Sequence, residues 1–405
     1  MRVLFTVSSW ATHYATMVPL GWALQAAGHE VRVVCPPSQV PSLSATGLVP
    51  VPVLDGLDVR QRLRLQYYDQ AVAGAWPYPW LPPHPLTGAP LRTLAGFDRA
   101  AYAATQAPLL AARAAAGHDA ALAYARWWRP DLVLHDPASL EGALVGAVLG
   151  VASVMCLWGP VGTHEPGHAA IVPPDHSGSF PRHGLGEFTP DRIHTVIDPC
   201  PAAVAPPLRA ARLRVRYVPY NGAAPSPPWL PDPPPRPRVA VSWSTALTTT
   251  SGPRSYLLPT LVAALHAEDV DLVVTATRED VAALGTVPPG VRVAEHVPLR
   301  LLLPTCAAVI HHGGGGSTLT SLWAGVPQLV ATFAAEQSAS AARVAAAGAG
   351  LHVEGHEATE ETIRTSVKAL LSDPSFAAAA RAQQADMAAQ PTPADLVATL
   401  SALTR

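Results

Sequence analysis

A run of four glycines behind two histidines is the most specific chemical signal in this sequence. The run lies in VIHHGGGGSTLTSLWAGVPQLV (residues 309–330), where the pattern predicts a strand that ends at Ile310 and a helix that Ser317 opens and that runs to about Ala324. Glycine lets a backbone approach a ligand closely, and the free N–H groups and the dipole at the start of a helix attract phosphate. The run therefore predicts a diphosphate site.

Polar side chains around the glycines could complete such a site. His311 or His312 could give a charge-assisted hydrogen bond, and the hydroxyls of Ser317 and Thr318 could bind phosphate or cap the helix. A glycine-rich tight turn with a capping serine is the alternative that this segment alone leaves open. Two commoner phosphate loops do not fit, because a P-loop requires a lysine where Ser317 stands and a dinucleotide fingerprint requires a third glycine where Thr318 stands.

A second pair of residues, His13 and Asp136, suits proton transfer. His13 follows the first predicted strand and Asp136 follows another at 132–134, so both lie at the carboxyl edge of one sheet, where α/β folds bind ligands. A histidine there can act as a general base toward a hydroxyl. Two structural alternatives stay open: a solvated loop histidine for His13, and a helix cap for Asp136, because Pro137 suits a first helical position.

Two α/β halves carry these residues, since buried strands alternate with helices in each half. In the first half we predict strands at 3–7, 31–35, 132–134 and 152–157 and a helix at 18–27. In the second half we predict strands at 239–243, 271–275, 291–294, 308–310 and 328–331 and a helix at 255–266. Each half is expected to form a doubly wound domain.

A proline-dense segment, RYVPYNGAAPSPPWLPDPPPRPR, separates the two halves. Proline at this density cannot continue a helix or a central strand. We predict one domain over residues 1–215, a linker over 216–238 and a second domain over 239–385. Residues 386–405 are expected to form a helical segment that packs back on the first domain. A chain of 405 residues agrees with two domains, since one core rarely serves more than about 300 residues.

The composition argues against several classes of partner. The 27 basic and 29 acidic residues nearly cancel, so nucleic acid and anionic membranes are not expected partners. The four cysteines lie far apart without a CxxC pair, which argues against a zinc site and predicts a cytoplasmic location. Residues 142–159 carry no charge, but Gly146, Gly150 and Pro160 interrupt the stretch and favour a short helix and a buried strand over a membrane span.

Between residues 58 and 90 the sequence loses its periodicity and gathers Trp76, Tyr78 and Trp80 among prolines. A long irregular loop inside a compact domain is usually functional or mobile. We expect a hydrophobic lid that binds the acceptor, with a disordered insertion as the alternative. Trp10 and Trp158 fall in loops near His13 and are expected to line the same acceptor pocket.

Taken together, these motifs resemble the nucleotide-sugar-binding signature of family 1 glycosyltransferases with the GT-B fold, and especially actinobacterial enzymes that decorate polyketide natural products. The resemblance rests on HHGGGGSTLTSLWAGVPQLV followed by Glu336 and Gln337, on RYVPYNG, on SSWATHYATMVPLGWALQAAGHEV, and on RPDLVLHDPASLEGAL with LWGP. It spans nearly the whole chain. It implies two Rossmann-like domains that face each other across a cleft, the first for the acceptor and the second for the donor.

The resemblance assigns roles in donor binding. His312 matches a phosphate-binding histidine, and the diphosphate cradle is completed by Ser244, Thr245, Gly315, Gly316 and Ser317. Glu336 and Gln337 match the pair that holds the sugar hydroxyls, although most relatives have aspartate first. Val297 stands, with Pro298, where relatives hold the nucleobase.

The resemblance also assigns the catalytic pair. His13 matches the general base, and Asp136 matches the aspartate that hydrogen-bonds this histidine, orients its ring and stabilises the imidazolium. If Asp136 instead acted directly on an activated phenol, carbon glycosylation would follow.

Thr320 bears on the choice of nucleotide. Relatives that use UDP often have glutamate at this position, where a carboxylate can accept hydrogen bonds from ribose hydroxyls. A deoxyribose lacks the 2′-hydroxyl, so Thr320 predicts a dTDP-sugar as co-substrate, with a deoxysugar as the transferred group.

The sequence thus predicts an inverting glycosyltransferase that acts on an apolar polyketide-type aglycone, without a metal or another cofactor. A nucleotide-sugar epimerase and a non-catalytic partner that binds nucleotide sugar are the alternatives. A homodimer and a separate activator protein both stay open.

Overall fold

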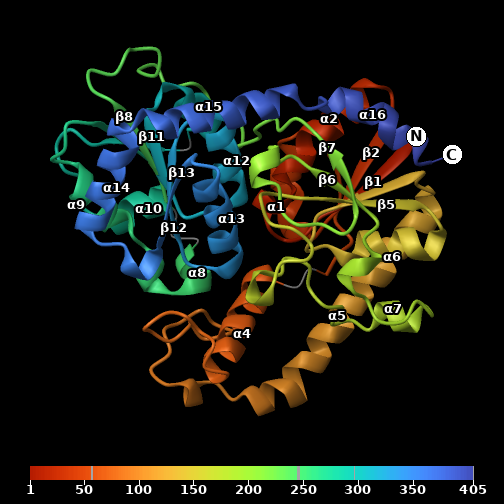
Figure 1. Cartoon of the computed structure of the whole chain (residues 1–405). Helices are drawn as coiled ribbons and strands as arrows, with labels where there is room; N and C mark the ends of the chain where they lie inside the picture. Colours follow the sequence, from red (N-terminus) through yellow and green to blue (C-terminus); the bar gives the residue numbers. More distant parts are fainter. Residues whose placement is uncertain (56–57, 244–246, 296, 405) are drawn as a thin grey trace.

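Two lobes, each built on a parallel sheet, form the chain, and the computed structural model describes residues 1–55, 58–243, 247–295 and 297–404 (Figure 1). The first sheet has the order β3-β2-β1-β4-β5-β6-β7 and the second the order β10-β9-β8-β11-β12-β13. Every described pairing between these strands is parallel. The predicted fold class, two doubly wound Rossmann-like domains, is confirmed.

The strands have these bounds: β1 Arg2–Thr6, β2 Glu30–Val34, β3 Val49–Val51, β4 Leu132–His135, β5 Ala152–Cys156, β6 Thr195–Asp198, β7 Ala211–Arg214, β8 Arg238–Ser242, β9 Asp271–Ala276, β10 Arg292–Glu295, β11 Ala308–His311, β12 Gln328–Thr332 and β13 Gly350–Glu354. The α-helices are α1 Ala11–Tyr14, α2 Val18–Ala26, α3 Val40–Ser44, α4 Val59–Val72, α5 Arg99–Trp128, α6 Leu140–Leu149, α7 Ser179–Arg182, α8 Thr248–Ser251, α9 Leu258–Leu265, α10 Arg278–Leu284, α11 Leu299–Leu302, α12 Gly315–Ala324, α13 Ala335–Ala346, α14 Glu360–Ser372, α15 Pro374–Ala389 and α16 Pro393–Ala402.

The strand orders place the chemical residues at equivalent points of the two sheets. In the first sheet the winding reverses between β1 and β4, and in the second between β8 and β11. His13 follows β1 and Asp136 follows β4, while His312 follows β11. Ligands of doubly wound sheets bind at such reversal points, outside the carboxyl ends of the strands. Each lobe therefore presents its candidate residues at the place where its fold opens a crevice.

The sequence pattern predicted an irregular segment between residues 58 and 90, but the structure shows that part of this segment is regular. Its first part is the helix α4, whose N-cap Asp58 accepts a hydrogen bond from the Arg60 N–H. The pattern is hidden because buried residues such as Arg64, Tyr67 and Tyr68 do not form one apolar stripe. Figure 1 shows α4 and α5 as an arm below the two lobes.

Two other helices begin elsewhere than predicted. The helix expected at 255–266 begins at Leu258, because Pro253–Ser255 form a separate 3₁₀ turn. The helix expected to open at Ser317 begins two residues earlier, at Gly315, and its N-cap Gly314 offers no side chain. Ser317 is therefore inside the first turn and does not cap this helix.

The C-terminal helices join the two lobes (Figure 1). Helix α15 packs on α12 of the second lobe, whereas α16 packs on α2 of the first. Leu396, Val397 and Leu400 of α16 are buried in the core that contains β1 and α2. A buried ion pair adds a second connection, since the guanidinium of Arg343 on α13 lies 2.8 Å from the fully buried carboxylate of Glu165. These contacts fix the orientation of one lobe relative to the other.

The charge-free stretch 142–159 divides between α6 and β5, with Gly150 in a left-handed conformation (φ 66°) as the C-cap of α6. Across the described ranges, no helix combines the length and the apolarity that crossing a membrane would require.

Candidate active site

His13 lies in α1, after β1, and its ring is held by two stacked tryptophans. Trp158 stacks on one side, with ring centroids 3.9 Å apart and an interplanar angle of 14°, and Trp10 lies stacked at 5.7 Å and 10°. Nδ1 of His13 lies 3.2 Å from the Ser8 hydroxyl. Because Nδ1 is engaged by Ser8, Nε2 is the ring atom left for a ligand.

Asp136 reaches His13 through Ser8. Its carboxylate accepts hydrogen bonds from the N–H groups of Ser8 and Ala138, each at 2.7 Å, and among the described residues no hydrogen bond joins it directly to His13. The sequence predicted a direct bond, but the folded chain inserts Ser8 between the two residues. Asp136 is completely buried and caps a turn rather than α6, whose N-cap is Ser139. It can therefore orient His13 and stabilise its charged form without touching a ligand.

Burial shifts the pKa values of this pair in opposite directions. The pKa of His13 is lowered to about 3 by burial and, to a smaller extent, by the charge of Arg62. The pKa of Asp136 is raised to about 6, because burial outweighs the hydrogen bonds that it accepts from Ser8 and Ala138. Near neutral pH the histidine is consequently neutral and able to accept a proton, while the carboxylate beside it is charged.

The glycine run presents an anion site at the first turn of α12. The first backbone hydrogen bond of this helix runs from Thr318 N–H to the Gly314 carbonyl. The N–H groups of Gly315, Gly316 and Ser317 therefore have no acceptor within the helix and are available to an anion. A Cβ added to Gly316 would have no other heavy atom within 4 Å, so the space beside the Gly316 Cα is open.

The two histidines before the glycines have different roles. His311 is completely buried; its Nε2 lies 2.7 Å from Gln328 Oε1, and its Nδ1 accepts a hydrogen bond from Gly313 N–H. It thus fixes the entry to the turn, where Gly313 has φ +88°. The buried Nδ1 of His312 has no partner among the described residues, and its Nε2 would lie 3.0 Å from a Cβ on Gly314. Of the two, His312 is the one free to bind a ligand.

His312 is neutral while the site holds no anion, since burial lowers its pKa to about 4. A diphosphate placed beside the ring would favour the charged form and raise this pKa. The charge-assisted hydrogen bond predicted for this residue therefore depends on the ligand's own charge.

The loop that follows β5 touches the glycine run directly. A Cβ added to Gly315 would collide with the carbonyl oxygen of Trp158, and a Cβ on Gly159 would come within 2.8 Å of the Gly315 Cα. The tryptophan that stacks on His13 therefore also packs on the first turn of α12. Glycine is required at 159 and 315 for this close approach of the two lobes.

One cavity of about 520 Å³ extends from His13 to Glu336, and so contains residues of both lobes. Much of its lining is apolar and comes from three segments: Val59, Leu63 and Leu65 of α4, Trp158, and the strip Ala170, Ile171, Val172, Pro173 and Pro174. Its volume lies within the range of small-molecule sites.

Glu336 and Gln337 begin α13 next to the glycine run. Burial raises the pKa of Glu336, although its own N–H and Gln337 hydrogen-bond the carboxylate. The Gln337 side chain accepts a hydrogen bond from Phe333 N–H at 3.3 Å, and its Cβ lies 3.1 Å from where a Cβ on Gly313 would be. The structure therefore brings Glu336 into the cavity with His13 and places Gln337 against the glycine turn.

The predicted nucleoside residues lie farther inside the protein. Thr320 is completely buried, and its hydroxyl is 2.6 Å from the Gly316 carbonyl, 3.1 Å from the Tyr217 hydroxyl and 3.2 Å from Asn221 Nδ2. Contrary to the expectation of a ribose contact, this side chain faces protein. Val297 is half-buried against a neighbouring apolar cluster. Ser244 and Thr245 lie outside the described residues.

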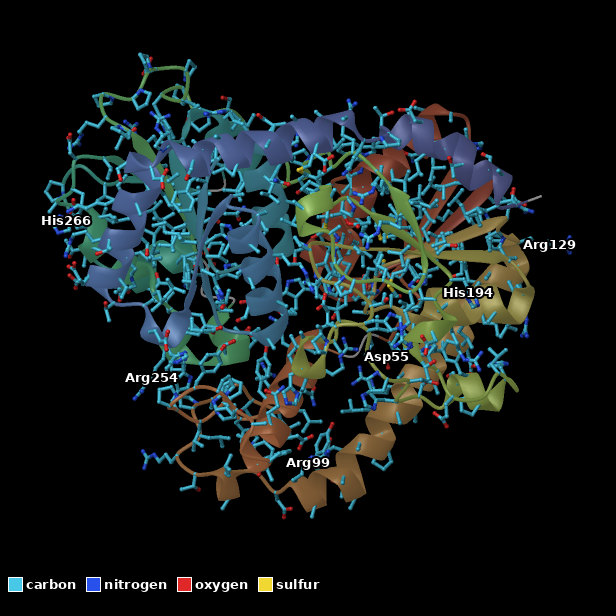
Figure 2. All side chains as sticks on the ribbon, in the orientation of Figure 1. Asp55, Arg99, Arg129, His194, Arg254 and His266 are labelled. Atoms are coloured by element: carbon cyan, nitrogen blue, oxygen red, sulfur yellow. The ribbon has the colours of Figure 1, made fainter. Side chains whose placement is uncertain are left out.

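The aromatic residues of the expected lid pack on the second lobe instead of lining the cavity. Tyr78 is buried in the core of that lobe, 6.0 Å from the Phe333 ring, and Trp76 and Trp80 pack around it. Arg254 covers Trp80 at 5.6 Å, at the point that Figure 2 labels below the second lobe. Aromatic rings gain more from burial against a formed core than from exposure in an open pocket. Of the five predicted acceptor residues, only Trp158 lines this cavity.

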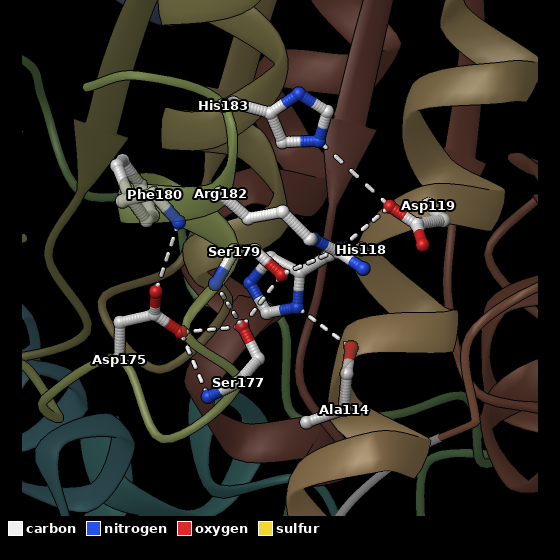
Figure 3. A network of polar contacts seen from close by, with 9 residues as sticks. All are labelled: Ala114, His118, Asp119, Asp175, Ser177, Ser179, Phe180, Arg182 and His183. Atoms are coloured by element: carbon white, nitrogen blue, oxygen red, sulfur yellow. Dashed lines mark hydrogen bonds and ion pairs between the residues drawn. The ribbon is translucent and has the colours of Figure 1, made fainter. Parts of the chain in front are cut away.

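A polar network holds the cavity wall formed by residues 170–176. Asp175 accepts hydrogen bonds from the N–H groups of Ser177 and Phe180, and Arg182 nearby pairs with Asp119 of α5 at 2.8 Å (Figure 3). His118 of the same helix lies behind Ser179 in this view, with its Nδ1 bonded to the Ala114 carbonyl (Figure 3). The wall is thereby anchored to α5.

Three residues of the site had no place in the sequence-based prediction. Ser8 directly follows β1, and its position at the sheet reversal was the signal that could have identified it. Arg62 and Tyr67 line the cavity from α4, in a segment whose helical character the sequence did not reveal.

Comparisons with known proteins find similar proteins over almost the full length of the chain. Residues 105–244 and 259–403 match the N-terminal and C-terminal domains of the family described as Erythromycin biosynthesis protein CIII-like. The chain is 36% identical to aklavinone 7-beta-L-rhodosaminyltransferase of Streptomyces galilaeus (100% of this chain, 96% of that protein) and 33% identical to 10-deoxymethynolide desosaminyltransferase of Streptomyces venezuelae (100% and 97%). The solved structure of spinosyn rhamnosyltransferase SpnG complexed with thymidine diphosphate superimposes with a TM-score of 0.76 at 30% identity, covering 99% of this chain and 100% of that one.

The open space at the Cβ position of Gly316 allows a substitution that tests the anion site. Gly316→Ala should leave thermal stability unchanged or slightly raised, because alanine favours a helix and meets no neighbour. The affinity for dTDP should fall by about 10-fold or more, since a methyl group would obstruct access to N–H groups that bind charged oxygens. Calorimetric titration and thermal melting measure the two effects.

Gly313→Ala is the contrasting variant. Its positive φ and its crowded surroundings predict loss of stability as well as binding. Unchanged dTDP affinity in a stable Gly316→Ala protein would contradict the assignment of the cradle.

Proposed function

Because this chain belongs to the Erythromycin biosynthesis protein CIII-like family of GT-B glycosyltransferases, we propose that it moves a deoxysugar from a dTDP-sugar to a hydroxyl of a polyketide-type aglycone. The observation that carries the proposal is the single cavity that His13 lines from the first lobe and Glu336 from the second. A base for the acceptor and a carboxylate for the donor sugar thus share one space. The relatives named for aklavinone and 10-deoxymethynolide support the substrate class.

The reaction proposed is a single in-line displacement. The acceptor oxygen attacks the anomeric carbon while Nε2 of neutral His13 takes the hydroxyl proton. The bond between that carbon and the diphosphate oxygen breaks, and dTDP leaves with the electron pair. Since no covalent intermediate forms, the anomeric configuration inverts.

Each group around His13 has a task in this step. Asp136, through Ser8, stabilises the imidazolium as it forms, in the manner of the aspartate in a catalytic triad. The indole faces of Trp10 and Trp158 favour the same cation, because aromatic faces attract positive charge. His13 is thus kept neutral before the reaction and is stabilised as a cation during it.

The leaving group is received by the first turn of α12. The N–H groups of Gly315, Gly316 and Ser317, the helix dipole and His312 would bind the charge that develops on the diphosphate. In the proposal these groups suffice without a metal ion. Glu336 and Gln337 would hold the sugar hydroxyls.

Two alternatives are less compatible with the geometry. Carbon glycosylation by direct action of Asp136 on a phenol would need a carboxylate in the cavity, whereas Asp136 is completely buried behind Ser8. An epimerase would have no use for the apolar wall opposite the donor residues.

The opposite pKa shifts of His13 and Asp136 predict a specific pH dependence. His13 stays neutral down to about pH 3, so the acid limb of kcat/KM should reflect protonation of Asp136 near pH 6. Asp136→Asn should lower kcat by about 100-fold and remove this limb. Asp269→Asn, at an exposed position of the second lobe, is the control and should leave the profile unchanged.

Loss of the fold has to be separated from loss of catalysis in this test. A carboxyl whose pKa is raised by folding stabilises the protein at low pH, and the contribution is lost as the pH rises through about 6. Removing the charge relieves this cost near neutral pH, but the amide Nδ2 of Asn cannot accept the hydrogen bond from the N–H of Ser8 or Ala138, so thermal melting is measured beside kcat. An Asp136→Asn enzyme with normal kcat, or an acid limb that survives the substitution, would contradict the assigned role.

The choice of nucleotide can be tested without an acceptor. The Thr320 side chain faces protein, so the support for dTDP comes from the relative solved in complex with thymidine diphosphate. Binding of dTDP should be tighter than that of UDP in calorimetric titration. dUDP has the deoxyribose of dTDP but lacks the methyl group of thymine. Its affinity should therefore be close to that of dTDP if the deoxyribose determines the preference. Tighter binding of UDP would contradict the proposal.

A further inference from the structure

Arg62 brings a positive charge into the cavity without a protein group to neutralise it. It lies on α4 and lines the main cavity together with His13 and Glu336, as well as two adjoining ones. Within the described ranges, its guanidinium has no hydrogen-bond or ion-pair partner. Burial is the largest influence on its pKa, which is lowered.

Three neighbouring arginines, Arg60, Arg64 and Arg99, have partners in the protein. Arg60 pairs with Asp58 at 3.1 Å, and Arg64 donates to the carbonyls of Pro85, Leu86 and Thr249. Arg99, labelled at the bottom of Figure 2, pairs with Asp69 at 2.9 Å. The other two arginines of α4, Arg60 and Arg64, thus have partners in the protein, whereas Arg62 lines the cavity.

The charged and titratable groups near Arg62 form no ion pair with it within the described ranges. Asp136 and Glu141 act on it only at a distance, and both are already bonded, to Ser8 and Ala138 and to the Ser139 hydroxyl respectively. His13 and His176 have lowered pKa values, from burial first and from the charge of Arg62 second. Both histidines are neutral near pH 7, so neither adds to the positive charge of Arg62.

A half-buried cation that lines a small-molecule cavity without an ion-pair partner favours a ligand contact there, because a ligand can supply the counter-charge. The donor diphosphate already has its own cradle on α12. In the proposed function the acceptor occupies the space between His13 and the apolar strip 170–174, so the group that meets Arg62 belongs to the acceptor. A planar guanidinium suits two neighbouring oxygens in one plane.

We propose that Arg62 selects acceptors that carry an acidic phenol or enol beside a carbonyl, by binding the oxygen pair in its anionic form. This rests on the proposed function, since it assumes that the cavity receives the acceptor. Arg62 is then a specificity residue for aromatic polyketides over fully aliphatic lactones. His13 still takes the proton from the hydroxyl that is glycosylated.

The test uses the full chain with two probes, 1,8-dihydroxyanthraquinone and its 1,8-dimethoxy derivative, which differ only in the acidic hydroxyls. Binding is followed by quenching of tryptophan fluorescence and by the visible absorption band of the bound dihydroxy dye. The wild type should bind the dihydroxy compound about 10- to 100-fold more tightly than the dimethoxy compound, and shift its band toward that of the anion.

Three variants separate charge from shape. Arg62→Gln should abolish both the preference and the band shift, whereas Arg62→Lys should keep part of each. Arg60→Gln, two residues earlier and outside the cavity, should change neither. Arg62→Gln should also melt at the same temperature as the wild type or higher, because it removes an unpaired cation; a structural arginine would lower it.

Several outcomes would overturn the inference: an equal loss of both probes in Arg62→Gln, a preference that survives it, or no preference in the wild type. A chain that binds dTDP and glycosylates an aliphatic macrolactone but does not distinguish the dyes would refute only the role of Arg62. A chain that transfers sugar to no acceptor would refute the proposed function, whatever the dyes show.

Discussion

The contact between the Trp158–Gly159 backbone and the first turn of α12 is the constraint on which the candidate site depends. A side chain on Gly315 or Gly159 would prevent it. Through this contact the carboxyl edges of the two sheets meet, and the residue that stacks on His13 also touches the diphosphate cradle. The distance between base and donor is therefore set by glycine packing. The Arg343–Glu165 pair and α16 hold the same arrangement from farther away.

The segment formed by α4 and the loop after it links the acceptor side to the donor domain. Its tip is anchored by Tyr78 in the core of the second lobe, while Arg62 and Tyr67 on the helix line the cavity. A change in the angle between the lobes would consequently move the acceptor wall as well. The aromatic residues that looked like a lid in the sequence act in the structure as its anchor.

Local sequence patterns were sufficient for the fold and for much of the site. Alternating buried strands and helices predicted both doubly wound sheets, and the position of His13, Asp136 and His312 at strand ends predicted the edges that carry the chemistry. What failed depended on long-range packing. Helix α4 lacks an apolar stripe because it is covered on more than one side, Ser8 replaces a direct bond between His13 and Asp136, and Thr320 is buried by Tyr217 and Asn221 of the linker.

The configuration of the product shows whether a base in one lobe and a diphosphate cradle in the other act on one bond. The purified chain would be incubated with a dTDP-deoxysugar and a polyketide aglycone, and the new glycoside examined by NMR for the configuration at its anomeric carbon. We expect one glycoside whose anomeric configuration is opposite to that of the donor. Retention of configuration, or conversion of the nucleotide sugar without any glycoside, would contradict this expectation.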